Sequence, residues 1–246
     1  PTDAQFVLDA LVGQVVPLAR HAFGCRVLQR MIEHCTPAQT TPIIDELLEA
    51  VDSLLTDQYG NYVVQHVLES GMARHRSAIV HATRGRVHEL ACHKFASNVM
   101  EKCVQHCTPD ERHNIILAEL LRNGGAPIYS MVGDQYGNYV VQKLIEVCDA
   151  PHRERVLAVL RPMLATLDQL CYGKHIIQCM AKHDPALAAY LNATRGASSS
   201  SSPTSGAASS SSASSSSSST APSVAGVGAG PGCVLSPPTA PASATA

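Results

Sequence analysis

The chain has 246 residues, long enough for one domain or two, and its 18 Lys and Arg against 20 Asp and Glu give a formal net charge of −2. This balance argues against a non-specific polyanion binder, for which a strongly basic surface is typical. The nine cysteines, an odd number without a spaced framework, indicate reduced thiols in an intracellular protein, and no apolar run approaches the ~18 residues of a membrane helix.

The first predicted elements are helices around an apolar cluster at Phe6, Val7, Leu8 and Leu11. We expect these helices to pack on a preceding structural unit, because their apolar face would otherwise be exposed. The chain begins with Pro1 rather than Met, which indicates a fragment of a longer protein.

The elements that follow repeat along the chain. Residues 57–65 and 134–142 are both DQYGNYVVQ, and three related segments are AFGCRVLQR, KFASNVMEK and CYGKHIIQC. Aligned on one polar position, the five copies have anchors at 29, 65, 101, 142 and 178, with spacings of 36, 36, 41 and 36. The longer spacing holds extra residues near Arg122–Pro127, a predicted Gly/Pro loop. A fixed period of this length predicts stacked repeats.

Other columns of the alignment predict that each repeat is helical throughout. One column is aromatic: Phe23, Tyr59, Phe95, Tyr136, Tyr172. The next column holds small residues: Gly24, Gly60, Ala96, Gly137, Gly173. A third column, further upstream, holds Leu or Met: Leu18, Leu54, Leu90, Met131, Leu167. Two Thr-Pro pairs, at 36–37 and 108–109, are typical helix starts. Residues 1–195 are therefore predicted to form an all-α solenoid with a continuous core and a long concave face.

The last segment, residues 196–246, consists of Ser, Ala, Gly and Pro with few other residues and no charge. Such a composition buries too little apolar surface to offset its chain entropy. We expect a disordered Ser/Ala/Pro-rich tail.

The repeated segment also predicts a polar surface. On a helix of about 100° per residue, Asn61, Tyr62 and Gln65 share a polar arc, while Val63, Val64, Val67 and Leu68 form the packing face. Stacking the repeats places such triplets in a ladder, and they are, in chain order, Cys25/Arg26/Gln29, Asn61/Tyr62/Gln65, Ser97/Asn98/Glu101 and Asn138/Tyr139/Gln142. The fifth copy, Lys174/His175/Gln178, departs from the pattern.

The third position of each triplet changes between Gln and Glu on a constant scaffold, as a base selector would. The Watson–Crick edges of uracil and adenine each offer a donor and an acceptor, which an amide can match. Guanine offers two adjacent donors, which a carboxylate such as Glu101 can accept together. The middle residue, a ring or guanidinium, can stack between successive bases.

These triplets, the period of about 36 residues and the terminal YGKHI closely resemble the Pumilio (PUF) family of RNA-binding proteins over residues 5–185. The resemblance implies a right-handed α-solenoid of three-helix repeats and one base read per repeat. It assigns base-edge contacts to the outer triplet positions: Cys25, Gln29, Asn61, Gln65, Ser97, Glu101, Asn138 and Gln142. It assigns stacking to Arg26, Tyr62, Asn98, Tyr139 and, in the closing cap, His175.

By the same resemblance, Cys with Gln implies adenine, Asn with Gln uracil, and Ser with Glu guanine. Because the family binds RNA antiparallel, the chain implies 5′-UGUA-3′ in the 3′ untranslated regions of messenger RNA. The four copies look like the C-terminal four of the family's usual eight repeats, a partial Pumilio homology domain in residues 1–195. The implied outcome is translational repression or decay in the cytoplasm by a monomer, through repressor proteins and a deadenylase complex, without a cofactor.

Three further readings stay open or are disfavoured. Arg30, His66, Lys102, Lys143 and Lys174 are candidate phosphate contacts, but Glu33, Glu69 and Glu146 follow three of them at i+3 and explain those three equally well as local ion pairs. A zinc site at Cys103, His106, Cys107 and His113 is disfavoured, because Cys103 and Cys107 fall in packing columns. No catalytic constellation stands apart from the repeat, so we expect no enzyme.

Two rival functions remain. One is a protein-binding solenoid of armadillo or HEAT type, which has no reason to alternate Gln and Glu in step with the first triplet position. The other is a nucleolar PUF relative with relaxed sequence preference, against which the intact triplets count.

Overall fold

The computed structural model describes residues 5–199, with side chains for residues 5–193, and this part consists of helices and turns without a strand. After α1 (Gln5–Leu11), the first repeat contains α2 (Val15–Ala19), α3 (Gly24–His34) and α4 (Pro37–Glu49), and the second contains α5 (Val51–Leu55), α6 (Gly60–Ser70) and α7 (Ala73–Ala82). The third repeat contains α8 (Val87–Ala91), α9 (Ala96–His106), α10 (Pro109–Glu111), the π-helical segment η2 (Arg112–Leu117) and α11 (Ala118–Leu120).

A short turn, η3 (Arg122–Gly125), leads into the fourth repeat, which contains α12 (Ala126–Met131), α13 (Gly137–Val147) and α14 (Ala150–Leu160). The last helices are η4 (Arg161–Met163), α15 (Leu164–Gln169), α16 (Gly173–Ala181) and α17 (Pro185–Ser199). The predicted boundary at residue 195 lies inside α17, and the predicted tail from residue 200 onward lies outside the described residues.

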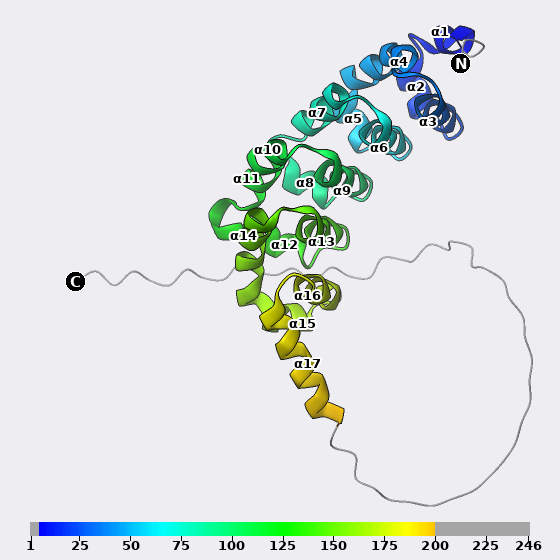
Figure 1. Ribbon diagram of the computed structural model, residues 1–246. Helices are drawn as coiled ribbons and strands as arrows, with labels where there is room; N and C mark the ends of the chain where they lie inside the picture. The colour runs from blue at the N-terminus through cyan, green and yellow to red at the C-terminus, as the bar shows by residue number, and fades with distance from the viewer. Residues whose placement is uncertain (1–4, 200–246) are drawn as a thin grey trace, which may run out of the picture.

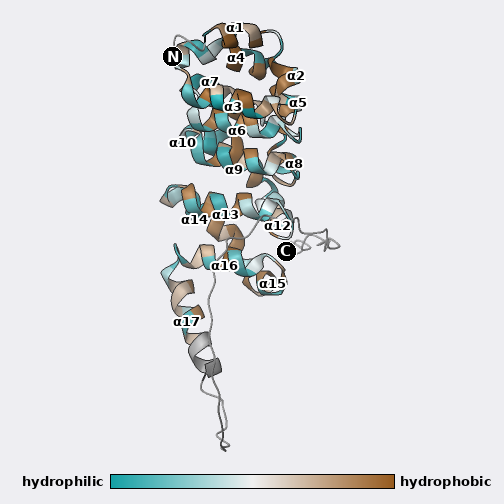
Figure 2. Ribbon diagram, turned by 90° about the vertical axis from the view of Figure 1, so that its right-hand side faces the viewer, coloured by the Kyte–Doolittle hydropathy of each residue, from teal (hydrophilic) through white to brown (hydrophobic). Residues whose placement is uncertain are grey.

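The helices form the predicted α-solenoid. In Figure 1 the chain curves as an arc, with α3, α6, α9, α13 and α16 along its concave side and α4, α7, α10, α11 and α14 along its convex side. We call the first set the inner helices. Each inner helix contacts the one before and the one after it, and Figure 2 looks directly onto this column. The sequence repeat is therefore a spatial repeat.

The paired columns of small and large residues mark a close helix crossing. A Cβ atom added to Gly60 would lie 2.7 Å from Leu54 Cδ2, and one added to Gly137 would lie 3.1 Å from Met131 Cβ. The inner helix of each repeat thus starts against the short helix before it, with room for no more than a small side chain. This contact fixes where each inner helix begins.

A column of arginines, not singled out from the sequence, supports the other end of three inner helices. Arg76 donates to Gly71 O (2.7 Å), Arg112 to Val104 O (3.0 Å) and Cys107 O (3.3 Å), and Arg153 to Ile145 O (2.7 Å) and Cys148 O. These bonds satisfy carbonyls at helix C-termini, which have no partner within the helix.

The first repeat has Thr40 in place of that arginine. Its hydroxyl donates within its own helix, to Thr36 O (3.3 Å) and Pro37 O (3.4 Å). A cavity of about 20 Å³ lies beside it, lined by Ile32, Cys35 and His75 among others. The C-terminus of α3 therefore lacks the arginine cap that α6, α9 and α13 have.

The predicted helix starts at the two Thr-Pro pairs are confirmed. Thr108 N donates to Glu111 Oε2 (2.9 Å), and Glu111 N donates back to Thr108 Oγ1 (3.2 Å), a reciprocal capping box. Thr36 N donates to Gln39 Oε1 (3.1 Å) in the same way. Pro37 and Pro109 each occupy the first helical position.

The N-terminal layer is partly uncovered. Leu8 packs into the core, as α1 contacts α4, but Phe6 and Phe23 are 74% and 75% exposed. Within residues 5–199 every helix is too short or too polar to cross a membrane.

Candidate nucleic-acid interface

The base-reading candidates occupy the first two turns of the inner helices. Four of these helices begin in the same way: the N–H groups of two consecutive residues donate to one side chain. Asp57 Oδ1 accepts from Tyr59 N (2.8 Å) and Gly60 N (2.7 Å), and Asp134 Oδ1 accepts from Tyr136 N (2.9 Å) and Gly137 N (2.7 Å). In the first and third repeats a ring nitrogen, Nδ1 of His21 or His93, accepts the corresponding pair.

The first position of each triplet is buried, which corrects the helical-wheel prediction of an exposed arc. Asn61 is only 1% exposed, and Cys25, Ser97 and Asn138 are also buried. Asn61 Nδ2 donates to Asp57 O (2.8 Å) and Gln58 O (3.1 Å), which draws the side chain toward the start of its helix. Asn138 Nδ2 donates to Asp134 O (2.9 Å) in the same way.

The third position is oriented by the first in the two Asn repeats. Gln65 Nε2 donates to Asn61 Oδ1 (3.0 Å), and Gln142 Nε2 donates to Asn138 Oδ1 (3.0 Å). Each Gln is half-buried. The bond fixes which way the Gln amide points, so its oxygen and its second N–H remain for a ligand.

Glu101 is the acidic member of this column and is half-buried beside Ser97. Burial raises the pKa of its carboxyl, Lys143 and Lys102 lower it, and Glu146 raises it further. An ionised carboxylate at this place is poorly solvated, so a ligand with two N–H donors would compensate for the lost water.

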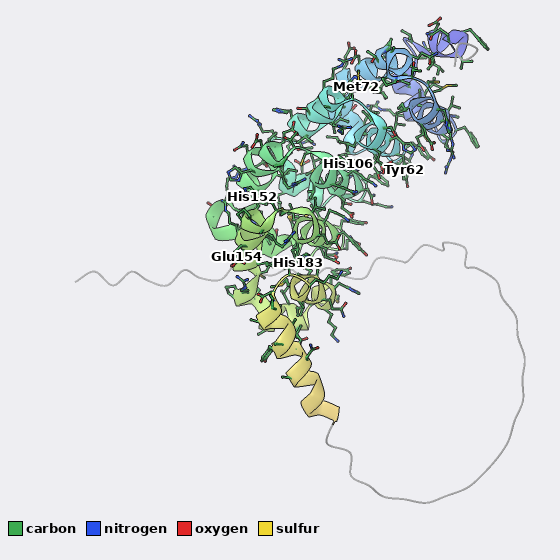
Figure 3. All side chains as sticks on the ribbon, in the orientation of Figure 1. Tyr62, Met72, His106, His152, Glu154 and His183 are labelled. Carbon is green, nitrogen blue, oxygen red and sulfur yellow. The ribbon has the colours of Figure 1, made fainter. Side chains whose placement is uncertain are left out.

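The middle position of each triplet is exposed. Tyr62 and Tyr139 are 52% and 53% exposed, and Figure 3 shows Tyr62 at the concave edge. Arg26, Asn98 and His175 are exposed at the equivalent places, and Asn98 Nδ2 donates to Phe95 O (3.4 Å). Exposed side chains follow one another at one per repeat, and the two tyrosine rings and the Arg26 guanidinium among them are flat groups on which flat ligands can stack.

The candidate phosphate column is engaged in ion pairs. Arg30 pairs with Glu33 (2.6 Å), Lys143 with Glu146 (3.1 Å) and His66 with Glu69 (3.3 Å), the local pairs that the sequence allowed. Lys102, which has no acidic residue at i+3, pairs with Glu69 of the preceding repeat (2.5 Å). Lys174 is exposed on α16. Arg30 is exposed, whereas His66, Lys102 and Lys143 are half-buried. Ion pairs that remain open to solvent are weak, so the Arg and Lys side chains stay available to an anionic chain.

The cysteines considered for zinc lie where the alignment places them. Cys103, Cys107 and Cys148 are buried in the core, and burial raises the pKa of the Cys107 and Cys148 thiols to about 11. Among the described residues there is no group of three His, Cys, Asp or Glu side chains that could hold a metal ion.

The sequence reasoning missed the capping column and the arginine column. The capping residues stand two positions before each aromatic, and they alternate in chain order: His21, Asp57, His93, Asp134. Reading that column would have predicted a shared helix start. The arginines at 76, 112 and 153 share the repeat spacing, but Thr40 interrupts them.

Comparison with known proteins places these repeats in a family. The model of the Pumilio-family RNA-binding repeat matches residues 14–48, 51–82, 86–121 and 127–161. Pumilio homology domain family member 4 of Saccharomyces cerevisiae is 36% identical over 186 residues, which cover 72% of this chain and 21% of that protein. Pumilio homolog 4 of Arabidopsis thaliana is 39% identical over 141 residues, 57% of this chain and 14% of that one.

Solved structures of Pumilio-family proteins agree with this family assignment. PUF-8 in complex with PBE-RNA aligns with a TM-score of 0.66 and 37% identity, covering 74% of this chain and 54% of that one. The Puf4 RNA-binding domain, bound to a recognition sequence in the 3′ untranslated region of HO endonuclease RNA, aligns with a TM-score of 0.61 and 34% identity, covering 73% and 57%. The chain thus spans about half the length of these RNA-binding domains and about a fifth of the yeast relative.

Proposed function

Because the chain belongs to the Pumilio family, whose repeats bind RNA and are not enzymes, we propose that its inner helices bind single-stranded RNA containing 5′-UGUA-3′, one base per repeat. The RNA runs antiparallel to the chain, with α13 at the first base and α3 at the fourth. The relatives bound to 3′ untranslated RNA sequences support this class of ligand.

The observation that carries the proposal is the ladder of half-buried third-position side chains on four stacked helices, each close to an exposed middle residue, which is a tyrosine ring in α6 and α13, Arg26 in α3 and Asn98 in α9. In α6 and α13, the amide held by Asn presents one acceptor and one donor, the complement of the N3–H and a carbonyl of uracil. In α9, the carboxylate of Glu101 presents two acceptors, the complement of the N1–H and N2–H of guanine.

The first-position side chains contribute differently. Asn61 Nδ2 already donates to two backbone carbonyls, so a contact from it to a base requires exchange of one of these bonds, whereas Asn138 Nδ2 donates to one carbonyl. Ser97 and Cys25 are smaller and leave room for a purine edge. The first triplet position therefore has two proposed roles: it orients the Gln at the third position, and it contacts the base.

The biological consequence we propose is repression or decay of messenger RNA in the cytoplasm, by a monomer that recruits repressor proteins and a deadenylase complex. Its support is membership in the family and the 3′ untranslated sequences bound by the solved relatives.

The test exchanges one selector pair for another that the chain already contains. Ser97→Asn with Glu101→Gln reproduces in α9 the outer triplet positions of α6 and α13. The double variant should prefer 5′-UUUA-3′ over 5′-UGUA-3′, a change of about 1–3 kcal/mol at that base. Glu146→Gln, which alters an exposed carboxylate paired with Lys143 on the neighbouring inner helix, is the matched control and should keep the guanine preference.

The measurement is a competition titration with the two RNAs at one salt concentration, because phosphate contacts make affinity depend on salt. A double variant that is folded by circular dichroism yet still prefers guanine would refute base reading by this ladder. A protein-binding solenoid would then be the better interpretation of the concave face.

A further inference from the structure

The four helix starts of the ladder use two chemically different acceptors in strict alternation. The carboxylates of Asp57 and Asp134 accept from two N–H groups each at 2.7–2.9 Å. The imidazoles do so at longer range: His21 Nδ1 from Phe23 N (3.3 Å) and Gly24 N (3.2 Å), His93 Nδ1 from Phe95 N (3.2 Å) and Ala96 N (3.3 Å).

This bonding is possible only for a neutral imidazole. With both Nδ1 contacts coming from N–H donors, Nδ1 must carry a lone pair, and the proton must be on Nε2. Uptake of a second proton converts the acceptor into a donor that faces two other donors. Imidazoles take up that proton between about pH 5 and 8, whereas an ordinary Asp remains an acceptor down to about pH 4.

The capped turn holds the recognition residues themselves. Cys25 N donates to His21 O (3.0 Å) and Ser97 N donates to His93 O (3.0 Å), and the stacking residues Arg26 and Asn98 follow directly. Two of the three triplet positions in each of these repeats therefore lie in the first turn that the imidazole caps. Loss of the cap leaves two N–H groups without a partner and lets that turn fray.

We propose that His21 and His93 are positioning residues that order the starts of α3 and α9 only while neutral. Acidification then weakens recognition at these two repeats, and leaves the Asp-capped repeats α6 and α13 unchanged. This inference rests on the proposed one-base-per-repeat function, in which α3 and α9 face the two purines of UGUA.

The charged neighbours differ at the two sites. Near His93 lie Lys94 and the exposed carboxylate of Glu89, whose pKa is lowered by Arg86 and, more weakly, by His93; Asp134 of the next repeat acts on the adjacent thiol of Cys92. Near His21 lie Arg20, which donates to Ser53 of α5 (2.5 Å), and Arg26 on α3. The His21 site is the cleaner one to test, because its selector Gln29 does not titrate, whereas Glu101 does.

The experiment measures the preference of the whole chain for 5′-UGUA-3′ over 5′-UGUU-3′ at pH 7.5 and pH 5.5, by competition at fixed salt. In the parent we expect this preference to fall by about fivefold at the lower pH, the factor that corresponds to loss of one helix cap. In His21→Asp the preference should stay within about twofold, because the carboxylate caps at either pH. If that variant is unfolded by circular dichroism, His21→Asn supplies an amide oxygen that does not titrate, with the same expected result.

The reciprocal variant Asp57→His should transfer the effect to the third base of the RNA, where the preference for UGUA over UGAA should become sensitive to pH. A parent whose adenine preference is equal at both pH values, or a His21→Asp variant that keeps the parent's full pH dependence, overturns the inference. The absence of any adenine preference at pH 7.5 would instead refute the base-reading function on which it rests.

Discussion

Removal of the guanidinium of Arg112 should destabilise the solenoid at the C-terminus of α9. Arg112 is 8% exposed and donates to Val104 O and Cys107 O, the last turn of α9. Hydrogen bonds to a charged group contribute about 1.5–3 kcal/mol each, and the freed side chain regains up to about 2 kcal/mol of rotamer entropy. We therefore expect Arg112→Thr to lower the free energy of unfolding by about 2–4 kcal/mol.

Thr is an informative replacement because the chain contains it at the equivalent place in the first repeat. Thr40 bonds within its own helix and leaves a small cavity, so a threonine at position 112 should not restore the cap. Arg74→Thr is the matched control. Arg74 lies two residues before Arg76, is exposed, and forms an ion pair with Asp45 (3.2 Å) in place of a bond to a helix end. It should cost at most about 1 kcal/mol.

The assay is urea denaturation followed by circular dichroism, combined with hydrogen exchange of residues 101–117, since a repeat protein can open locally. The variant should unfold at lower urea concentration, and the amides at the end of α9 should exchange faster than in the control. A loss of stability below about 1 kcal/mol, or equal exchange in both variants, would refute the structural role given to the arginine column.

Other predictions concern the interface and the N-terminal layer. Tyr62→Ala and Tyr139→Ala should each weaken RNA binding by about 1–3 kcal/mol without changing base preference, and unchanged affinity for UGUA would exclude stacking. Burial raises the pKa of Glu101, so folding favours its protonated carboxyl. The contribution of Glu101 to the free energy of unfolding is therefore complete below its unfolded-state pKa and is lost as pH rises through its folded-state pKa. Glu101→Gln should thus increase the urea midpoint more at pH 7 than at pH 4, and an equal increase would contradict this. Amides of residues 5–20, next to exposed Phe6 and Phe23, should exchange faster than those of α6, and uniform protection would argue against a frayed first layer.

The period and the column chemistry made the helices and their stacking predictable from the sequence. The change between Gln and Glu is the basis of the proposed selector column, and the Thr-Pro pairs identified two helix starts. The helix starts are a local signal, because the residues that form each cap lie within one turn of each other. The Gln and Glu column appears only when residues about one repeat apart are compared.

Contacts with backbone carbonyls and contacts between repeats were not predictable in the same way. A helical wheel places Asn61 on a polar arc, but its amide turns inward to the carbonyls of Asp57 and Gln58, which no side-chain pattern reveals. The pair between Lys102 and Glu69 depends on how far one helix is shifted along its neighbour, and only the packed structure fixes that shift.

The five additional residues before the fourth repeat have a consequence for the nucleotide register. They are shared between the outer helix α10–η2–α11 (Pro109–Leu120), which is longer than α7 and includes a π-helical segment, and the turn that follows it. In that turn, η3, Asn123, Gly124 and Gly125 have positive φ values of 51°, 68° and 88°, and Gly125 lies against Val159 of α14. Helices α9 and α13 nevertheless contact each other directly, as the other neighbouring inner helices do. Chain length outside the inner helices is thereby uncoupled from the spacing of the inner helices, so under the proposed one-base-per-repeat binding the fourth repeat meets the next nucleotide without a spacer.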